Sequence, residues 1–315
     1  MRAPVATAKA GLPNFSHSEA TVRRVPREVY VRLDRLPKEL QSEHLAWREE
    51  TIEFIKTRAD LFPTTARLPL KRVVVLVDKL AEDLHRLTTV LSMAHGNPDL
   101  GNKEDPVDEL VYIILSRRTR EGSYQGDFER LKESFSSWES LADAGQEELE
   151  RLLYSSGFSG KKARTIKKAL RTLIETFGRC TLEPTRSWAD VEVADFLCSL
   201  PEVGPKSAAC VMMCSLDRPA FPVDAHVGRV VERVGVFRRI GLELAGRNHK
   251  QKQAILWDLV PPSLRYALHV NAVAHGRAQC LPFRPRCTTC SVGSTCAYSR
   301  ANGAVEPLPV AASRR

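Results

Sequence analysis

Helical periodicity without a strand pattern is the feature that most limits the fold of this 315-residue chain. Beyond residue 70, apolar residues recur at steps of three and four, as on one face of an amphipathic helix. The first such stripe consists of Leu76, Leu80, Leu84, Leu87 and Leu91. The following "GNPDLGN" is typical of a helix end. No segment shows a convincing alternating pattern, so we expect an all-α protein.

Most of the remaining chain predicts further helices, separated by Gly-, Pro- or Asn-rich breaks. We expect them near 107–117, 126–137, 146–155, 161–177, 191–199, 205–216, 225–234, 250–259 and 262–276. Residues 31–70 carry patchy helical signal, and residues 1–30 show no periodicity, so we predict that the first 30 lack fixed structure.

The composition indicates a folded protein with an anionic partner. Hydrophobic residues make up 43% of the chain, and the net charge is +9, which favours nucleic acid or an acidic membrane surface. No apolar run approaches the ~20 residues that cross a bilayer. The N-terminus lacks the apolar segment of a secretory signal. We therefore expect a protein that is neither secreted nor membrane-bound, and that is cytoplasmic and nucleoid-associated if the source is bacterial.

The stretch "LPEVGPKSAACV", from Leu200 to Val211, predicts a tight helical hairpin. Pro205 suits the first turn of a helix, where its missing N–H costs nothing. Gly204 can adopt positive φ and let another backbone come close. The unpaired N–H groups of the second helix then form an anion site that would suit a DNA phosphate.

Lys206 is unusual in that first turn, because its positive charge opposes the helix dipole and its neighbours are apolar. Both features should lower its pKa and make the amine a nucleophile toward a sugar C1′. The alternative is a lysine that extends to solvent and only contacts phosphate.

Asp224 is the candidate carboxylate partner, 18 residues after Lys206. It directly precedes a predicted helix, so it should act as the N-cap. One helix and a loop could bring it to the same cleft, where it could stabilise a developing oxocarbenium charge. For the nearby His226 we favour a structural role.

The eight cysteines fall into two groups. We interpret Cys180, Cys198, Cys210 and Cys214, which are scattered through apolar segments, as reduced core residues. The other four, at Cys280, Cys287, Cys290 and Cys296, are separated by six, two and five residues and predict a metal site. A [4Fe–4S] cluster explains this spacing better than zinc, since only one pair is close-spaced. Arg284 and Arg286 between the first two cysteines could then form a phosphate-binding loop.

The stretches "LPEVGPKSA", "FPVDAHVGRV", "AHGRAQC" and the Cys-x6-Cys-x2-Cys-x5-Cys spacing resemble, in the same order, the endonuclease III branch of helix-hairpin-helix DNA glycosylases. The resemblance covers roughly residues 72–300. It implies Lys206 as a Schiff-base nucleophile, Asp224 as the essential carboxylate, and a flipped base in a cleft between two helical lobes. The implied divisions are an N-terminal extension at 1–70, a six-helix lobe with the hairpin at 107–218, a cluster lobe at 71–106 and 219–300, and a tail at 301–315.

The same resemblance implies three groups of DNA contacts. In "ILSRRTREG", Arg117 and Arg118 stand in the loop that fills the gap left by the flipped base, where the family often has Gln. In "GFSGKKAR", Gly157 and Lys161 or Lys162 form a second DNA-facing turn. The hairpin contributes Val203, Gly204, Lys206 and Ser207. For both basic segments the alternative is a solvated surface.

Glu202 departs from the family pattern, because the family hairpin usually has Gly at this position. A carboxylate there would sit near a phosphate, and a residue other than Gly tolerates positive φ poorly.

These features together predict a bifunctional DNA glycosylase and AP lyase of base excision repair. We expect a monomer that acts on oxidised pyrimidines or abasic sites in duplex DNA through a Lys206 imine and β-elimination. Alternatives are a glycosylase for another base such as modified cytosine, a catalytically weak protein that binds damaged or bent DNA, and a zinc-stabilised helical interaction domain. The adenine-excising branch is disfavoured, because "VYIILSRRT" lacks the Glu that the branch carries on this helix.

Overall fold

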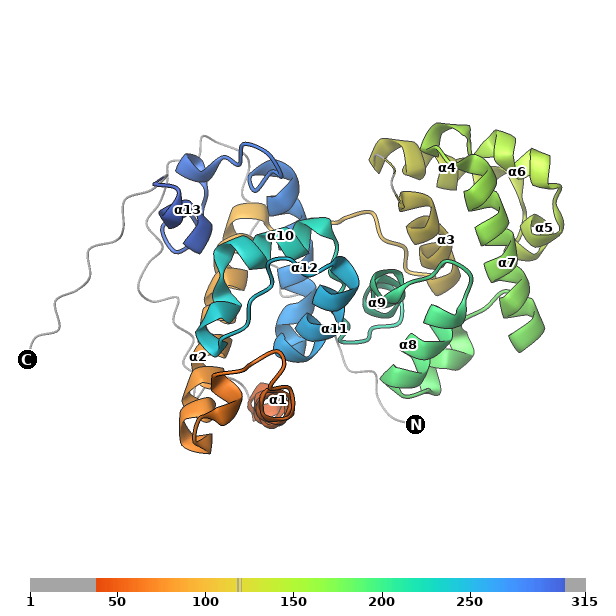
Figure 1. The fold of residues 1–315 in the computed structure, drawn as a ribbon. Helices are drawn as coiled ribbons and strands as arrows, with labels where there is room; N and C mark the ends of the chain where they lie inside the picture. The colour runs from red at the N-terminus through yellow and green to blue at the C-terminus, as the bar shows by residue number, and fades with distance from the viewer. Residues whose placement is uncertain (1–37, 118, 120, 304–315) are drawn as a thin grey trace, which may run out of the picture.

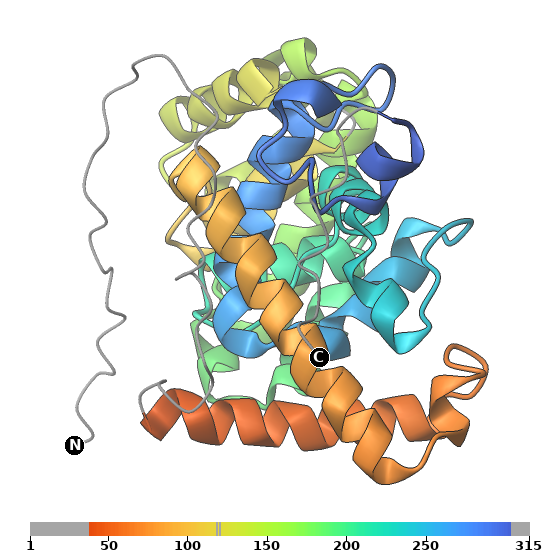
Figure 2. The ribbon, with the colours of Figure 1, turned by 90° about the vertical axis from the view of Figure 1, so that its left-hand side faces the viewer.

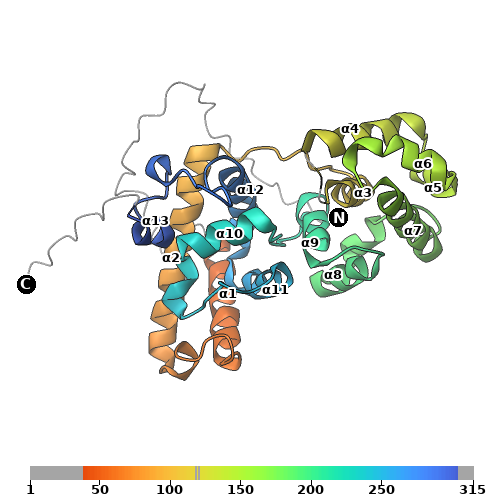
Figure 3. The same cartoon turned by 45° about the horizontal axis from the view of Figure 1, so that its top comes forward.

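The computed structural model describes residues 38–117, 119 and 121–303, and within them it contains α- and 3₁₀-helices without a strand. This confirms the all-α prediction. No helix in this part of the chain combines the length and apolar character required to span a bilayer. The helices form two groups, each around its own apolar core, which lie side by side in Figures 1 and 3.

The first group, which we name the cysteine lobe, combines the beginning and the end of the described chain. Its helices are α1 (Lys38–Thr57), η3 (Thr65–Arg67), α2 (Leu70–His95), α10 (Ala225–Val234), η6 (Val236–Ile240), α11 (His249–Leu259), α12 (Pro262–Ala278), η7 (Cys287–Thr289) and α13 (Ala297–Ala301). Helix α2 packs along α12, and both bury their apolar stripes in one core.

The second group, which we name the hairpin lobe, is continuous in sequence. It consists of α3 (Pro106–Ser116), α4 (Glu121–Ser134), α5 (Trp138–Asp143), α6 (Gln146–Leu152), η4 (Tyr154–Ser156), α7 (Ser159–Phe177), η5 (Glu183–Ser187), α8 (Asp190–Ser199) and α9 (Pro205–Cys214). Helix α3 packs against α9 in its core. Helix α9 also contacts α11, so these two helices join the lobes.

The leucine stripe lies on α2 as predicted. Leu80, Leu84 and Leu91 are fully buried, while Leu76 is only partly buried at the edge of the core. The helix ends at Gly96, whose φ of 72° places it in the left-handed region that favours glycine. The "GNPDLGN" stretch therefore ends this helix, as expected.

Residues 38–70 belong to the cysteine lobe rather than to a separate extension, which corrects the predicted division at residue 70. Trp47 and Ile55 of α1 are buried in its core. Thr51 Oγ1 donates to the Asp258 carbonyl at 3.2 Å. Figure 2 shows α1 lying across the beginning of α2. Prolines interrupt this region in the sequence, but tertiary burial still orders the helix. The predictions for residues 1–30 and for most of the 301–315 tail lie outside the described residues.

Candidate active site and cysteine centre

The predicted helical hairpin is present, with α8 ending at Ser199 and α9 beginning at Pro205. Gly204 precedes α9 without a side-chain cap, and its φ of −103° does not use the positive φ that a glycine can adopt. The left-handed residue of the link is Glu202, with φ 61°. A Cβ on Gly204 would meet no atom within 4 Å. The glycine therefore leaves open space in front of the uncapped N–H groups of α9, where a ligand backbone could approach closely.

A cleft of about 340 Å³ lies in front of this hairpin. One wall is formed by Arg117, Glu202, Val203, Gly204, Pro205, Lys206 and Ser207, and the other by His249, Lys250 and Gln253 of α11. The cleft therefore lies between the two lobes, as the sequence predicts. His249 and Lys250 on the second wall were not anticipated from the sequence.

Lys206 lines this cleft in a strongly charged environment. Burial disfavours its ammonium form, but the sulfur of Cys210 and the carboxylates of Asp224 and Glu109 outweigh it, so the pKa of Lys206 is raised. The predicted lowering was wrong, because the sequence does not reveal that two carboxylates face this lysine. Lys206 is therefore an ammonium at neutral pH, and it must lose a proton before it can act as a nucleophile.

Asp224 is the N-cap of α10, as predicted. Its Oδ1 accepts from the backbone N–H groups of His226 and Val227, both at 2.8 Å. Burial alone would raise the pKa of Asp224, but His269, the Val227 N–H and Lys206 together hold it below its usual range. The carboxylate is therefore charged at neutral pH, close enough to Lys206 for each to shift the pKa of the other.

The segment before Asp224 is fixed by two side chains of the cysteine lobe. Gln253 accepts from the Val223 N–H and donates to the Phe221 carbonyl, both at 2.7 Å. His269 Nδ1 lies 2.8 Å from the Pro222 carbonyl, and burial lowers the pKa of His269 to about 4. His269 is thus neutral near physiological pH, and it orients the carboxylate segment instead of adding charge. Neither residue was singled out from the sequence.

Glu109 is a second carboxylate of the Lys206 environment, and it was also missed. It lies on α3 and is fully buried. Its oxygens accept from Asn102 Nδ2 at 2.5 Å and the Lys103 N–H at 2.7 Å. Burial raises its pKa to about 7. The sequence signal was a lone Glu inside the apolar run "PVDELVYIIL". The stretch "VYIILSRRT" begins two residues later on the same helix. Its lack of Glu was the argument against adenine excision, and the presence of Glu109 on this helix weakens that argument.

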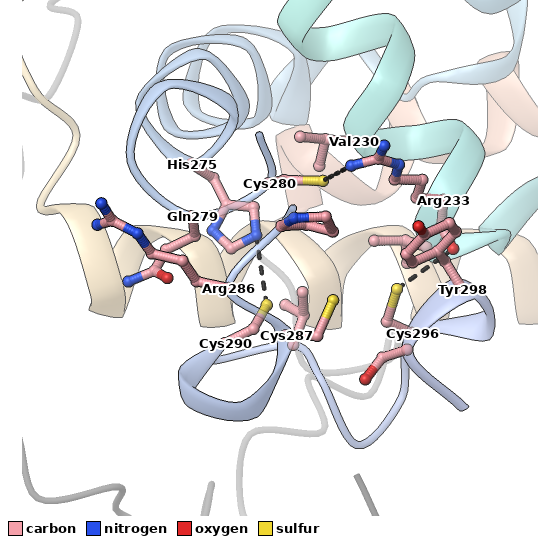
Figure 4. A pocket seen from close by; sticks show the side chains of 14 residues that line it. Val230, Arg233, His275, Gln279, Cys280, Arg286, Cys287, Cys290, Cys296 and Tyr298 are labelled. Carbon is pink, nitrogen blue, oxygen red and sulfur yellow. Dashed lines mark hydrogen bonds between the residues drawn. The ribbon is translucent and has the colours of Figure 1, made fainter. Parts of the chain in front are cut away.

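The four clustered cysteines line one cavity of the cysteine lobe, shown in Figure 4. Arg233 Nη1 donates to Cys280 Sγ at 3.5 Å, and His275 Nε2 lies 3.5 Å from Cys290 Sγ. Burial raises the pKa of Cys290 to about 11. Within the described ranges, no group of three or more His, Cys, Asp or Glu side chains is arranged to hold a metal ion.

The cysteine cavity nevertheless suits a soft metal centre chemically. Its lining contains four thiols and no carboxylate, and Arg233 supplies a positive charge beside them. Thiolates are the donors of iron–sulfur clusters and of structural zinc. Cys280, Cys287, Cys290 and Cys296 are the residues that would hold such a group.

Helix α10 ties the cysteine tract to the segment of Asp224. Arg229 Nε donates to the Cys280 carbonyl at 2.7 Å, and Arg233 Nη1 donates to the Leu281 carbonyl at 2.6 Å. A Cβ on Gly276 would come within 2.7 Å of the His226 Cβ. The glycine of "AHGRAQC" therefore allows α12 to approach α10 at His226.

The motif order and this geometry agree with the family comparison. Residues 111–262 match the family model described as HhH-GPD superfamily base excision DNA repair protein. The chain belongs to this superfamily. Its known relatives place it in the endonuclease III-like branch. Endonuclease III of Thermotoga maritima is 29% identical over 199 residues, covering 63% of this chain and 86% of that protein.

Two further comparisons support the same assignment. An Arabidopsis thaliana protein whose name marks it as a candidate DNA glycosylase is 33% identical over 175 residues, which are 56% of this chain and 58% of that protein. A solved endonuclease III in a non-covalent DNA complex shares the fold, with a TM-score of 0.59, 24% identity, and coverage of 70% of this chain and 95% of that one.

In this HhH-GPD protein, Glu202 joins two of the predicted DNA-binding cations. Its Oε2 lies 3.1 Å from Lys161 Nζ and 3.3 Å from Arg117 Nη1. Arg117 Nη1 also donates to the Glu202 carbonyl at 2.7 Å. Lys161 and Arg117 hold the pKa of Glu202 below its usual range. Glu202, which departs from the family pattern, thus places a negative charge between the hairpin and both basic segments.

In the segment predicted to form a second DNA-facing turn, the two adjacent lysines differ in exposure. Gly157 has a φ of 65°, and Lys161 is exposed at the surface. Lys162 is buried and its Nζ donates to Thr119 Oγ1, so of the two lysines Lys161 is the one available to a phosphate. Phe158, which the sequence reasoning missed, has a φ of 55° and is 63% exposed.

The remaining predicted DNA contacts differ in exposure. The side chains of Val203 and Ser207 are buried, so a DNA contact at these positions would use the backbone. Arg284 and Arg286 are exposed beside Phe283, which is 89% exposed. Arg118 lies outside the described residues.

The scattered cysteines are all free, as expected. Cys210 is buried one turn from Lys206, and burial raises the pKa of its thiol to about 11. Cys180 and Cys214 are half-buried. Cys198 is exposed, so its predicted place in a core is wrong.

Proposed function

We propose that this HhH-GPD protein is a bifunctional DNA glycosylase and AP lyase that removes oxidised pyrimidines from duplex DNA and also cleaves at abasic sites. The observation that carries the proposal is Lys206 on the wall of the inter-lobe cleft, in the field of the Asp224 and Glu109 carboxylates. A glycosylase that does not form an imine needs no such lysine.

In the proposed reaction, the damaged nucleotide leaves the stack and enters the cleft. The neutral amine of Lys206 attacks C1′ while the bond from C1′ to the base breaks, and the electron pair leaves with the base. The Asp224 carboxylate stabilises the positive charge that develops on the sugar, from a position fixed by Gln253 and the α10 N–H groups. The amine adduct then opens the sugar ring: the C1′–O4′ bond breaks, O4′ takes up the proton that the nitrogen loses, and an imine forms at C1′. Loss of a C2′ proton then expels the 3′ phosphate, and this β-elimination breaks the strand 3′ to the sugar.

The proposal includes a [4Fe–4S] cluster held by Cys280, Cys287, Cys290 and Cys296. Support comes from the four thiols around one cavity and from the family resemblance. When bound, the cluster would supply positively charged iron that keeps the sulfurs as thiolates. Arg284, Arg286 and Phe283 follow the first of these cysteines, so an ordered tract would present them as a DNA-binding loop.

We further propose that the protein acts as a monomer in the cytoplasm, at the nucleoid in a bacterial cell. The free state of all eight cysteines supports a reducing compartment.

Borohydride trapping tests the central claim. Wild-type protein incubated with duplex DNA containing thymine glycol or an abasic site should form a covalent adduct on reduction, and Lys206→Gln should not. Lys250→Gln is the matched control, because Lys250 lines the same cleft on α11 and should leave adduct formation intact. Absence of a wild-type adduct on both substrates would refute the lyase proposal.

A second candidate function differs only in the base. "AFPVDAHVGRV" also resembles plant 5-methylcytosine glycosylases. A panel of duplexes that carry oxidised pyrimidines or modified cytosines, each opposite guanine and adenine, separates these substrates by single-turnover rate. Tight binding without turnover on any of them would instead indicate a protein that only recognises damaged DNA.

A further inference from the structure

Glu109 is an ionisable side chain buried among apolar residues. It lies inside the apolar stretch of α3, the helix that packs against α9, and its side chain has no exposed surface. An isolated carboxylate in such a core is costly, unless it is held by donors or serves a charged partner. Two donors are present, the Asn102 amide and the Lys103 N–H. Each carboxylate oxygen has a second lone pair that these bonds leave unused.

Lys206 is the cation of α9 that interacts electrostatically with Glu109. The two groups are 97 residues apart in sequence, but their helices pack against each other. Glu109 is fully buried, and Lys206 is half-buried at the cleft. At neutral pH this lysine carries a proton that must be removed before it can attack a sugar.

The other candidate proton acceptors near Lys206 suit this task less well. Asp224 is held as a carboxylate by the α10 N–H groups, so it binds a proton weakly. His269 has its Nδ1 engaged with the Pro222 carbonyl and is likewise a weak base. The Cys210 thiol retains its own proton.

We propose that Glu109 accepts the proton that the Lys206 ammonium loses, and so generates the nucleophilic amine; this inference rests on the proposed function. The proton moves from Nζ to a free lone pair of the Glu109 carboxylate, directly or through one water. This leaves a neutral amine and a neutral carboxylic acid, so no net charge is created in the buried region. Asp224 then remains available, as an anion, to stabilise the sugar cation.

The charged and titratable groups around this exchange lie on several elements. They are Lys206, Cys210 and Cys214 of α9, Lys103 before α3, Arg117 and Glu202 at the cleft wall, Asp224 at the start of α10, His249 and Lys250 of α11, and His269 of α12. Burial raises the pKa of Glu109 to about 7. A protonated Glu109 cannot accept another proton, so the rate of imine formation should rise with pH through about 7.

The test measures single-turnover borohydride trapping on abasic DNA as a function of pH. Glu109→Gln, which keeps the shape but not the charge, should slow trapping by about 10²-fold and remove the rise through pH 7. Glu109→Asp should keep the rise at a reduced rate. Asn102→Ala is the structural control, because it removes one hydrogen bond from Glu109 and leaves its carboxylate. It should keep the rise with pH but shift it to higher pH, because the lost hydrogen bond lowers the pKa of Glu109 in the wild type. Circular dichroism verifies that each variant is folded.

A second measurement does not depend on activity. Titration of ¹³C-labelled lysine by NMR should show a lower pKa for Lys206 in Glu109→Gln than in the wild type, because one of the two carboxylates that raise it is gone. An unchanged Lys206 pKa, or a Glu109→Gln variant that traps at the wild-type rate with the wild-type pH profile, overturns this inference. If the wild type forms no adduct at all, the proposed function fails instead, and the lysine titration still decides whether the two groups are coupled.

Discussion

The inter-lobe cleft and the cysteine cavity are both lined by residues that sequence motifs singled out, but their charges are balanced differently. In the cleft, the carboxylates of Asp224 and Glu109 balance the positive charge of Lys206, and the lysine and each carboxylate shift one another's pKa. In the cavity, burial raises the pKa of Cys290 to about 11, and Arg233 and Arg286 are the positive groups at the lining. Thiols in such a setting become thiolates when a metal supplies positive charge.

This difference suggests that the two regions have separate tasks. The cleft is organised for chemistry by its own charges, whereas the cavity needs a bound group to reach a stable ionic state. Helix α10 connects them, since Asp224 caps its beginning and Arg229 and Arg233 hold the cysteine tract near its end.

The largest expected effect tests the cavity. Cys290→Ser should abolish cluster binding and lower the free energy of unfolding by more than about 4 kcal/mol, as expected for loss of a structural metal centre. Iron content, visible absorption and thermal unfolding measure this change. Cys210→Ser is the control, since this buried thiol lies outside the cavity and should leave iron content unchanged. A Cys290→Ser variant with full iron content would contradict the proposed ligand set.

The next effect separates charge from capping in the cleft. Asp224→Asn removes the carboxylate but keeps a good N-cap, so stability should change by less than about 1 kcal/mol. The rate of base removal should fall by about 10²–10³-fold, because the charge that stabilises the sugar cation is lost. Asp224→Ala should lose the same activity and, in addition, about 1 kcal/mol of stability. Single-turnover kinetics and chemical denaturation report the two quantities. Equal losses of stability in both variants would mean that the charge itself supports the fold.

Substitution of Phe158 should have a smaller effect, on the affinity for DNA. An exposed aromatic ring in a strained turn can insert between bases, so Phe158→Ala should weaken binding to abasic duplex by about 1–2 kcal/mol, roughly tenfold. Stability should not fall, since the ring is largely exposed. Phe283→Ala, in the loop after Cys280, shows whether the second exposed ring contributes equally. Fluorescence anisotropy with matched damaged and undamaged duplexes measures both, and unchanged affinity for the damaged duplex would exclude Phe158 as a wedge.

The smallest effect concerns Glu202. Glu202→Gln should tighten DNA binding about fivefold at low salt, because it removes a carboxylate that competes with phosphate for Lys161 and Arg117. The affinity should also fall more steeply with salt, since these cations become free to bind phosphate. Weaker binding would show instead that Glu202 orients Arg117 for DNA. Glu192→Gln, on the neighbouring α8 but away from the cleft lining, controls for the change in net charge.

Sequence by itself determined the features that depend on neighbouring residues. The positions of most helices from α3 to α12, the Asp224 cap and the cysteine spacing follow from interactions within a few residues. The short helix α5 was not predicted. Motif order was enough to identify the family, which the comparisons confirmed. The local signal was too weak for α1, whose order comes from packing against α2 and α12.

Only the tertiary structure decided the charges. The pKa of Lys206 is raised rather than lowered because Cys210 on the same helix, and Asp224 and Glu109 from distant parts of the sequence, act on it together. Lys162 is buried while its neighbour Lys161 reaches Glu202, a distinction that two adjacent lysines do not reveal. Electrostatic energy sums over every group within reach in space, whatever its place in the chain. The sequence therefore singled out the lysine that we propose as the nucleophile, and the fold set its protonation state.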